Sequence, residues 1–272
     1  MGHCPDESCE CEKCLELVHF PTRVADGAPS RKYDCTHMAD FYVCKYAHKY
    51  VSELIYAFKR LQDLKSRRDI KVLSFGCGPC TDVLALDYLR QSGTYCFETL
   101  EYRGIDYGKE VWKNIHANLK DARSAGLEIN YYYNDACKLI EQISAGQWVP
   151  NLVVFQYFFS DIKKNAQASE ISSFIREFSQ YANSKMPVGS YIVLNDINLS
   201  IDYDGGREYF DIMKNQINFS RYDSGHFRNN LRSAFSYGSE FEDNVLLFDV
   251  SAFDIYHPFE SCSSAQMILK KG

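Results

Sequence analysis

Four short apolar runs in the chain are each followed directly by glycine, acidic or amide residues. These are Gly76, Cys77 and Gly78 after residues 71–75, Asp106 and Tyr107 after 102–105, Asp135 and Ala136 after 131–133, and Gln156 after 152–155. Glycines let the backbone turn sharply and approach a ligand closely. A carboxylate at a strand end can accept hydrogen bonds from ribose hydroxyls. Either Asp106 or Asp135 alone could equally cap a helix, since aspartate favours that position too.

The elements that would position these residues alternate between strand and helix. The expected strands are 71–75, 102–105, 131–133, 152–155 and 191–194, and the expected helices are 39–64, 83–89, 109–125, 137–143 and 167–182. This alternation predicts an α/β fold with a mostly parallel sheet and helices on both faces. Ligands of such sheets bind outside the carboxyl ends of the strands. The four groups of residues are therefore expected to meet at one edge.

The C-terminal part departs from this alternation. Residues 245–256 and 265–270 are two strand-like runs with no helix between them, which predicts a terminal antiparallel hairpin. The preceding segment 202–242 is polar, and it could either cover a bound substrate or form a solvated pair of helices.

The order of these motifs resembles that of class I S-adenosylmethionine-dependent methyltransferases. The similar stretches are VLSFGCGPCTDVLAL (72–86), GID (104–106), NDA (134–136) and NLVVFQYFF (151–159), within a resemblance covering residues 66–272. The resemblance implies a seven-stranded, mostly parallel Rossmann-like sheet with a C-terminal antiparallel hairpin. An N-terminal Cys-rich arm and a helix, residues 1–65, would precede this domain.

The resemblance also implies roles for individual residues. Gly76, Cys77 and Gly78 would lie against the methionine part of S-adenosylmethionine, Asp106 and Tyr107 at the ribose and adenine, Asp135 and Ala136 at the adenine ring, and Gln156 near the methionine end. Two positions depart from the family pattern. Ser74 stands where an acid usually helps to hold the cofactor's amino group, and Cys80 stands where a third glycine is usual.

The implied activity is methyl transfer to an unidentified acceptor, in which the protein mainly positions two reactants. A base is needed if the acceptor is protonated, and the candidates are Tyr157, Asp161, Asp196 and His226. Two alternatives stay open: a nicotinamide-dependent oxidoreductase, and a non-catalytic interaction protein on a decayed methyltransferase fold. Against the oxidoreductase, Thr81 interrupts a G-x-G-x-x-G pattern and Asp106 follows Gly76 by 30 residues rather than about 20.

Cysteines are concentrated at the N-terminus. Cys4, Cys9, Cys11 and Cys14 could supply four thiolates to a structural zinc, although their spacing is not that of paired C-x2-C knuckles. Alternative ligands are His3, Cys35, His37 and Cys44, and a reduced tail without metal is an equal interpretation. Cys77 and Cys80 form a C-x-x-C, for which redox chemistry is the minor interpretation because the pair lies inside the glycine turn.

Composition limits the class of protein. The chain has 272 residues, with 36 acidic and 30 basic side chains and a net charge of −6. This balance gives no strong signal for nucleic-acid binding. No apolar run approaches the roughly 20 residues of a membrane helix, and the N-terminus has no signal-peptide pattern. We therefore expect a cytoplasmic protein without a membrane partner.

Overall fold

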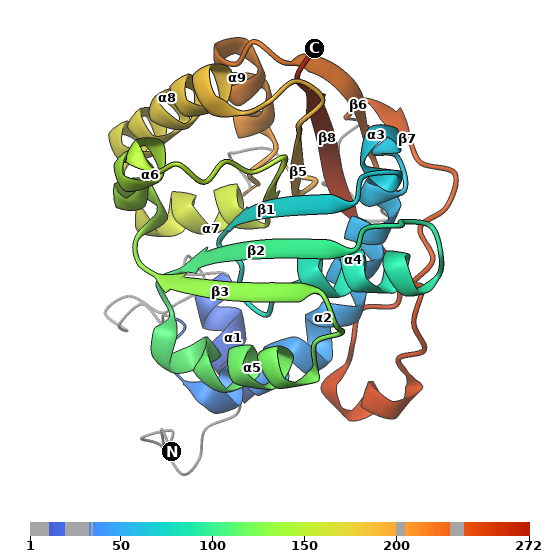
Figure 1. The fold of residues 1–272 in the computed structure, drawn as a ribbon. Coiled ribbons are helices and arrows are strands. Elements are labelled where there is room, and N and C mark those ends of the chain that lie inside the picture. The colour runs from blue at the N-terminus through green and yellow to red at the C-terminus, as the bar shows by residue number, and fades with distance from the viewer. Residues whose placement is uncertain (1–10, 20–32, 34, 200–204, 229–236) are drawn as a thin grey trace.

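The computed structural model describes residues 11–19, 33, 35–199, 205–228 and 237–272, which form one sheet with helices on both faces (Figure 1). The elements in chain order are α1 (Cys11–His19), α2 (Thr36–Phe58), α3 (Gln62–Lys65), β1 (Asp69–Phe75), α4 (Thr81–Gln91), β2 (Thr99–Asp106), α5 (Lys109–Ala122), β3 (Leu127–Tyr133), α6 (Ala136–Ala145), β4 (Leu152–Gln156), α7 (Phe158–Asn165), α8 (Ala168–Lys185), β5 (Tyr191–Ile197), α9 (Glu208–Gln216), β6 (Ser220–His226), β7 (Ser239–Glu240), η3 (Ser251–Tyr256) and β8 (Ser264–Lys270).

The strand order is β3-β2-β1-β4-β5-β8-β6-β7. Strands β1 to β5 are parallel, and β8 lies antiparallel between β5 and β6. The predicted α/β class, the mostly parallel sheet and the antiparallel C-terminal strand are thus confirmed. The described residues form eight strands rather than the seven expected. The chain order reverses between β1 and β4, which is where sheets of this kind bind their ligands.

One partner in the predicted hairpin was wrong. β8 pairs with β6, residues 220–226, whereas the segment 245–256 is irregular and ends in η3. Val245 and Ile255 in that segment are 60% and 77% exposed, and Leu247 and Phe248 pack against the edge of a core. β6 is largely polar in sequence, and its pairing depends on the backbone hydrogen bonds of β8 rather than on an apolar pattern.

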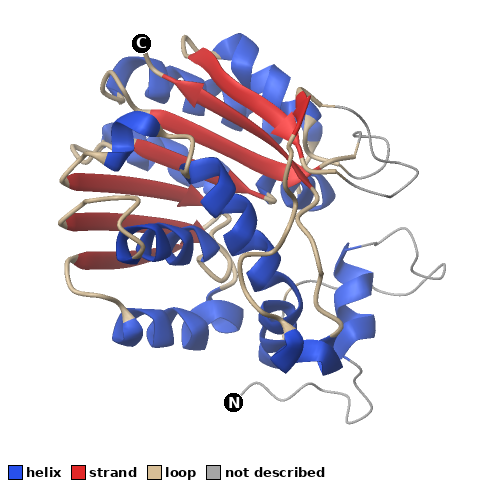
Figure 2. Ribbon diagram, turned by 90° about the vertical axis from the view of Figure 1, so that its right-hand side faces the viewer, coloured by secondary structure: helices blue, strands red, loops and turns tan. Residues whose placement is uncertain are grey.

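Helices cover both faces of the sheet (Figure 2), and a hydrophobic core lies on each face. On one face α2 and α4 bury Leu54, Phe58 and Leu86 against Val72 of β1. On the other face α6 to α9 enclose a group of aromatic rings in stacked and edge-to-face contact that includes Phe75, Phe155, Phe174 and Phe178. Helix α2 thus packs directly on the sheet, while the predicted domain boundary between residues 65 and 66 stays a prediction.

The N-terminal region is more regular than the sequence suggested. Within the predicted Cys-rich arm, residues 11–19 form helix α1, and α2 begins at Thr36, three residues before the predicted start at residue 39. Leu15 and Val18, three residues apart, are buried against Met38 at the start of α2, and this packing stabilises a helix too short to form alone. In the described part of the chain, no helix has the length and hydropathy needed to span a bilayer.

Candidate functional site

The turn between β1 and α4 is the centre of the candidate site. Gly76 and Gly78 have φ values of +63° and +45°, in the left-handed region that favours glycine. Cys80, at the position where the resemblance expects a third glycine, has φ +57° and precedes α4. A Cβ atom on Gly76 would lie 3.0 Å from the Phe158 ring, so this turn also packs closely against α7.

Asp106 links the end of β2 to this turn. Its Oδ2 accepts a hydrogen bond from the Gly78 N–H at 2.9 Å, and its Oδ1 accepts one from the Gly108 N–H at 2.8 Å. Burial raises the pKa of Asp106, while these two N–H donors act in the opposite direction. A carboxylate has about four lone-pair positions, so Asp106 can accept further donors beyond these two.

The register of the sheet brings the other strand ends to the same edge. Phe75 pairs with Ile105 on one side and with Phe155 on the other, so Gly76, Asp106 and Gln156 follow their strands at one level. The Gln156 side chain accepts a hydrogen bond from the Thr81 hydroxyl and donates one to the Tyr50 carbonyl at 2.9 Å. This convergence agrees with the predicted position of the site, and the role of each residue stays a prediction.

The remaining predicted cofactor residues lie at the ends of β2 and β3. Tyr107 is 50% exposed beside Asp106. Asp135 caps α6 by accepting a hydrogen bond from the Cys137 N–H at 2.9 Å, and Ala136 is the first residue of that helix. The helix-cap interpretation of Asp135 is therefore realised, and its second carboxylate oxygen lies 3.7 Å from Lys138 Nζ.

Two candidate bases have their side chains tied to structural partners. Asp196 is buried and accepts hydrogen bonds from the N–H groups of Phe159 and Ser160 at 3.0 and 3.1 Å, at the start of α7. Burial raises the pKa of Asp196 to about 6 despite these donors. The Tyr157 hydroxyl donates to Glu53 Oε2 at 2.8 Å, and burial raises the pKa of Tyr157 well above 10. Neither arrangement is that of a free base.

The other two candidates differ in their distance from the turn. Asp161 lies in the first turn of α7, and burial, together with the charges of Asp106 and Asp196, raises its pKa to about 6 although Lys164 opposes this. Its carboxylate therefore ionises near neutral pH. His226 ends β6, four strand positions from β1 and thus roughly 19 Å away across the sheet. This separation makes His226 a poor candidate for a base acting beside the glycine turn.

An aromatic cluster covers the same region and was not predicted. Tyr42 and Tyr46 of α2 surround His19 with ring centroids 6.0 and 5.2 Å away, and Tyr42 also contacts Trp112 of α5 at 5.7 Å. Trp112 in turn lies next to Gly78, since a Cβ there would be 3.8 Å from its ring. The signal that could have revealed the cluster is the four-residue spacing of Tyr42, Tyr46 and Tyr50 along α2.

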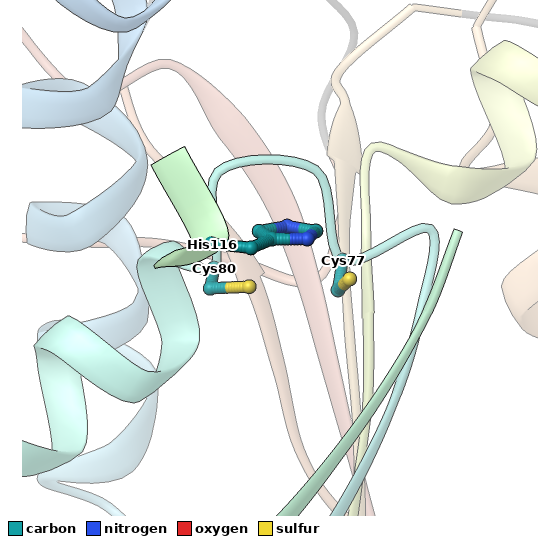
Figure 3. Close-up of side chains that lie close together, drawn as sticks. All are labelled: Cys77, Cys80 and His116. Atoms are coloured by element: carbon teal, nitrogen blue, oxygen red, sulfur yellow. The ribbon is translucent and has the colours of Figure 1, made fainter. Parts of the chain in front are cut away.

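Beneath the glycine turn, Cys77, Cys80 and His116 form what we call the thiol–imidazole cluster (Figure 3). One nitrogen of His116 and the two sulfur atoms all lie within 4.8 Å of one another. His116 Nε2 is 2.7 Å from the Gly78 carbonyl oxygen, and Nδ1 is 2.9 Å from the Tyr133 hydroxyl. Nothing in the sequence marked His116, which joins the turn only because α5 packs over it.

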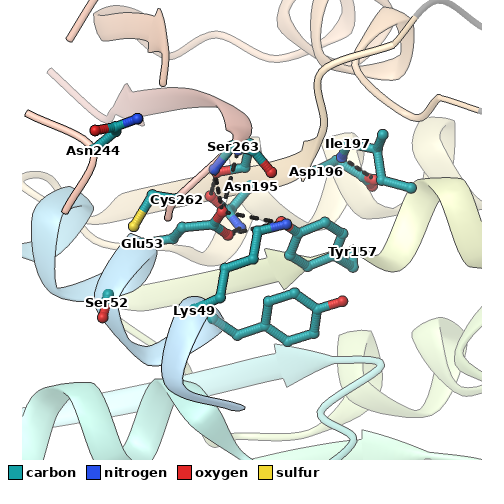
Figure 4. Close-up of polar contacts among 12 residues, drawn as sticks. Lys49, Ser52, Glu53, Tyr157, Asn195, Asp196, Ile197, Asn244, Cys262 and Ser263 are labelled. Atoms are coloured by element: carbon teal, nitrogen blue, oxygen red, sulfur yellow. Dashed lines mark hydrogen bonds and ion pairs between the residues drawn. The ribbon is translucent and has the colours of Figure 1, made fainter. Parts of the chain in front are cut away.

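A second polar group, the Glu53 network, joins α2 to the ends of β4, β5 and β8 (Figure 4). It comprises Glu53, Tyr157, Asn195, Ser264 and Gln266. Glu53 Oε1 accepts from the N–H groups of Ser263 and Ser264, and Oε2 accepts from Tyr157 and Asn195. Lys49 completes the network with its Nζ 3.8 Å from Glu53 and 4.6 Å from the centre of the Phe259 ring.

Cys11 and Cys14, two of the four predicted arm ligands, lie three residues apart on α1. The other two, Cys4 and Cys9, lie outside the described residues. The zinc site of the arm therefore stays a prediction.

No protein-family model matches the chain, and a search of curated proteins finds no match. Solved structures similar to this chain include several S-adenosylmethionine-dependent methyltransferases. The plantazolicin methyltransferase BpumL, in complex with SAH, is 13% identical and has a TM-score of 0.49, with 96% of this chain and 98% of that chain covered. A methyltransferase from Methanosarcina mazei is 14% identical with a TM-score of 0.36, over 75% and 93% of the two chains.

A protein from Bordetella parapertussis, described as a possible exported protein, is 15% identical with a TM-score of 0.49, over 97% of this chain and 79% of that chain. At such identities the likeness concerns the fold. The function is therefore inferred from the chain's own residues.

Proposed function

We propose that this chain binds S-adenosylmethionine above the glycine turn and transfers its methyl group to an acceptor. The observation that supports the proposal is that Gly76, Asp106 and Gln156 follow directly paired residues of β1, β2 and β4 and so lie side by side at one edge of the sheet. This edge is at the switch point, where the chain order reverses. The antiparallel β8 between β5 and β6 agrees with the sheet that the resemblance implies.

The residues fit this cofactor in two respects. The positive φ angles of Gly76 and Gly78 let the backbone turn without a side chain on its outer side, where the methionine part would lie. Asp106 keeps lone pairs for the ribose hydroxyls while its two backbone bonds hold the turn against β2. Tyr107 and Asp135 would lie at the adenine. When bound, S-adenosylmethionine supplies an electrophilic methyl group on a sulfonium.

The chain's own residues would then orient the acceptor and exclude water. Asp161 is the base we favour, because it ionises near neutral pH and is close enough to Asp106 for their charges to interact. Asp196 and Tyr157 would act indirectly, since one caps α7 and the other is fixed by Glu53. Tyr42 and Trp112 would shield the reaction from solvent.

Calorimetry with S-adenosylmethionine, SAH and NAD tests the proposal on the wild-type chain and on Gly78→Val. We expect wild type to bind the first two and Gly78→Val to lose at least a hundredfold in affinity. Gly93→Val is the matched control, because Gly93 also has a positive φ of +73° but lies at the far end of α4. It should bind like wild type.

The other outcomes are equally informative. Wild-type binding of NAD alone would establish the oxidoreductase alternative. Binding of none of the three by well-folded protein would favour the non-catalytic interaction protein. Equal affinities of the two glycine variants for S-adenosylmethionine would mean that the ligand does not lie on this turn.

A further inference from the structure

We propose that the thiol–imidazole cluster is a zinc site that fastens the glycine turn to α5. Its three groups converge from two elements: Cys77 and Cys80 from the turn, and His116 from the middle of the helix (Figure 3). All three are buried, with exposed fractions of 7%, 0% and 1%. Two thiols and an imidazole are typical ligands of zinc, whereas cations such as Mg²⁺ bind oxygen ligands.

The distances suit a tetrahedral site. With Zn–S bonds near 2.3 Å and Zn–N bonds near 2.0 Å, neighbouring ligand atoms lie roughly 3.5–3.8 Å apart. The three atoms lie within 4.8 Å of one another, so side-chain rotations that move each atom by about 1 Å would bring them to bonding positions. The C-x2-C spacing of the two cysteines is the spacing common in zinc knuckles.

The surroundings of the cluster also point to a missing partner. Asp82 Oδ2, two residues beyond Cys80, is buried without a hydrogen-bond partner among the described residues, and so is the hydroxyl of Tyr131. The Tyr131 ring stacks on His116 with centroids 3.8 Å apart. A buried polar atom without a partner is costly. A water molecule in the fourth position of a zinc ion would supply one for Asp82.

His116 can serve as a ligand at the expense of one present hydrogen bond. If Nε2 binds the metal, it gives up its contact with the Gly78 carbonyl, and Nδ1–H donates to the Tyr133 hydroxyl. A ligating histidine ordinarily donates its second nitrogen in this way. Cys77 packs against β2, since a Cβ on Gly104 would lie 2.8 Å from its sulfur. Its side chain is thus engaged below the turn, and the zinc site does not depend on the proposed cofactor.

A Cys77–Cys80 disulfide is the competing outcome for the same two sulfurs. It would require a two-electron oxidant, would release two protons and would make no use of His116. Because both thiols are buried, a bulky disulfide or enzyme oxidant has little access to them. The third ligand and the unpartnered Asp82 oxygen favour the metal.

The test uses the full chain with Cys4, Cys9, Cys11 and Cys14 all changed to Ser, which removes any zinc held by the arm. We expect about one equivalent of zinc by elemental analysis of protein purified under reducing conditions without chelator. Cys80→Ser and His116→Gln in this background should each retain less than a tenth of that zinc. Cys96→Ser is the matched control, because Cys96 is an exposed thiol away from the cluster, and it should keep the full equivalent.

A cobalt titration gives a second measurement on the parent protein, which does not depend on whether the variants fold. After removal of zinc, Co²⁺ should produce the thiolate-to-cobalt absorption of a tetrahedral site, and the band should be absent in His116→Gln. Metal-free protein with no such band would overturn the proposal. So would a Cys77–Cys80 disulfide, detected by mass spectrometry as the loss of two hydrogens, in place of zinc. Neither readout involves S-adenosylmethionine, so failure of the proposed function leaves this test intact.

Discussion

The Glu53 network and the thiol–imidazole cluster are both buried and polar, but the protein satisfies them to different extents. In the Glu53 network each carboxylate oxygen accepts two hydrogen bonds, and Asn195 Oδ1 accepts from Ser264 and Gln266 at 2.6 and 2.8 Å. These bonds join α2 to the sheet. A buried network of this kind fixes one arrangement of the elements, because any alternative leaves polar groups unpaired.

Around the thiol–imidazole cluster, by contrast, some buried polar groups have no hydrogen-bond partner among the described residues. Within the described part of the chain, Asp82 Oδ2 and the Tyr131 hydroxyl beside it have no hydrogen-bond partner, although both are buried. Asp106 accepts the N–H groups of Gly78 and Gly108 and a further bond from the Trp112 side chain, and its carboxylate retains the capacity for another donor. The difference suggests a division of roles: the completed network holds the fold, and the incomplete region is where ligands add the missing contacts.

The largest expected effect comes from breaking the completed network. Glu53→Ala leaves Tyr157, Asn195 and Lys49 buried without their common acceptor, as Figure 4 makes clear. Removing one member of a buried ionic network costs about 3–5 kcal/mol. Urea unfolding followed by circular dichroism should show this loss in the free energy of unfolding. Glu98→Ala, which removes an exposed carboxylate paired with Arg68 at 2.7 Å, is the control and should lose less than about 1 kcal/mol.

A smaller loss of stability, together with a loss of cofactor affinity, is expected when Asp106 is replaced. Asp106→Ala leaves the N–H groups of Gly78 and Gly108 without their acceptor, at a cost of about 2–4 kcal/mol in stability. It also removes the proposed ribose contact, so affinity for S-adenosylmethionine should fall at least tenfold. Melting curves of the free protein and calorimetry measure the two effects separately. Weaker stability with unchanged affinity would mean that Asp106 only stabilises the turn. The proposal that the region around the glycine turn binds a ligand would then lose its support from Asp106.

The sequence sufficed for the features that depend on local pattern. Alternating apolar runs and helical stripes predicted β1 to β5 and, within a few residues, the helices α4, α5, α6 and α8 between them; α7 was not predicted. The paired glycines predicted the turn, because a positive φ is a local requirement. The strand-end positions of Asp106 and Gln156 followed from the same alternation.

Features that depend on contacts between distant elements could not be predicted in this way. Helix α7 follows Tyr157, which has a left-handed conformation, and is capped by Asp196 from another strand, so its start has no local signal. Glu53 reaches Ser264 over 211 residues of sequence. β6 has no apolar alternation at all, and the run 245–256 resembles a strand more closely than β6 does.

A moderate, pH-dependent effect is expected at Asp161. Its pKa is raised from 3.8 to about 6, so the folded state holds the proton more tightly than the unfolded state. This residue therefore lowers the free energy of unfolding as pH rises from about 4 to 6, and the loss persists above pH 6. Asp161→Asn should remove it, gaining about 2–3 kcal/mol relative to wild type at pH 7 but less than about 1 kcal/mol at pH 4. Urea unfolding at both pH values measures the difference, and an equal gain at both would contradict the raised pKa.

The smallest effect is expected from removing the Tyr131 hydroxyl, and it compares the two regions most directly. Tyr131→Phe deletes a buried group that has no partner among the described residues, so the free energy of unfolding of the metal-free protein should stay within about 0.5 kcal/mol of wild type or rise. Tyr157→Phe deletes the same atom but leaves Glu53 Oε2 short of a donor, and should cost about 1–3 kcal/mol. Parallel unfolding curves measure both. Equal losses of stability in the two variants would mean that the polar groups around the thiol–imidazole cluster are as fully hydrogen-bonded as those of the Glu53 network. The proposal that one region holds the fold and the other binds ligands would then be wrong.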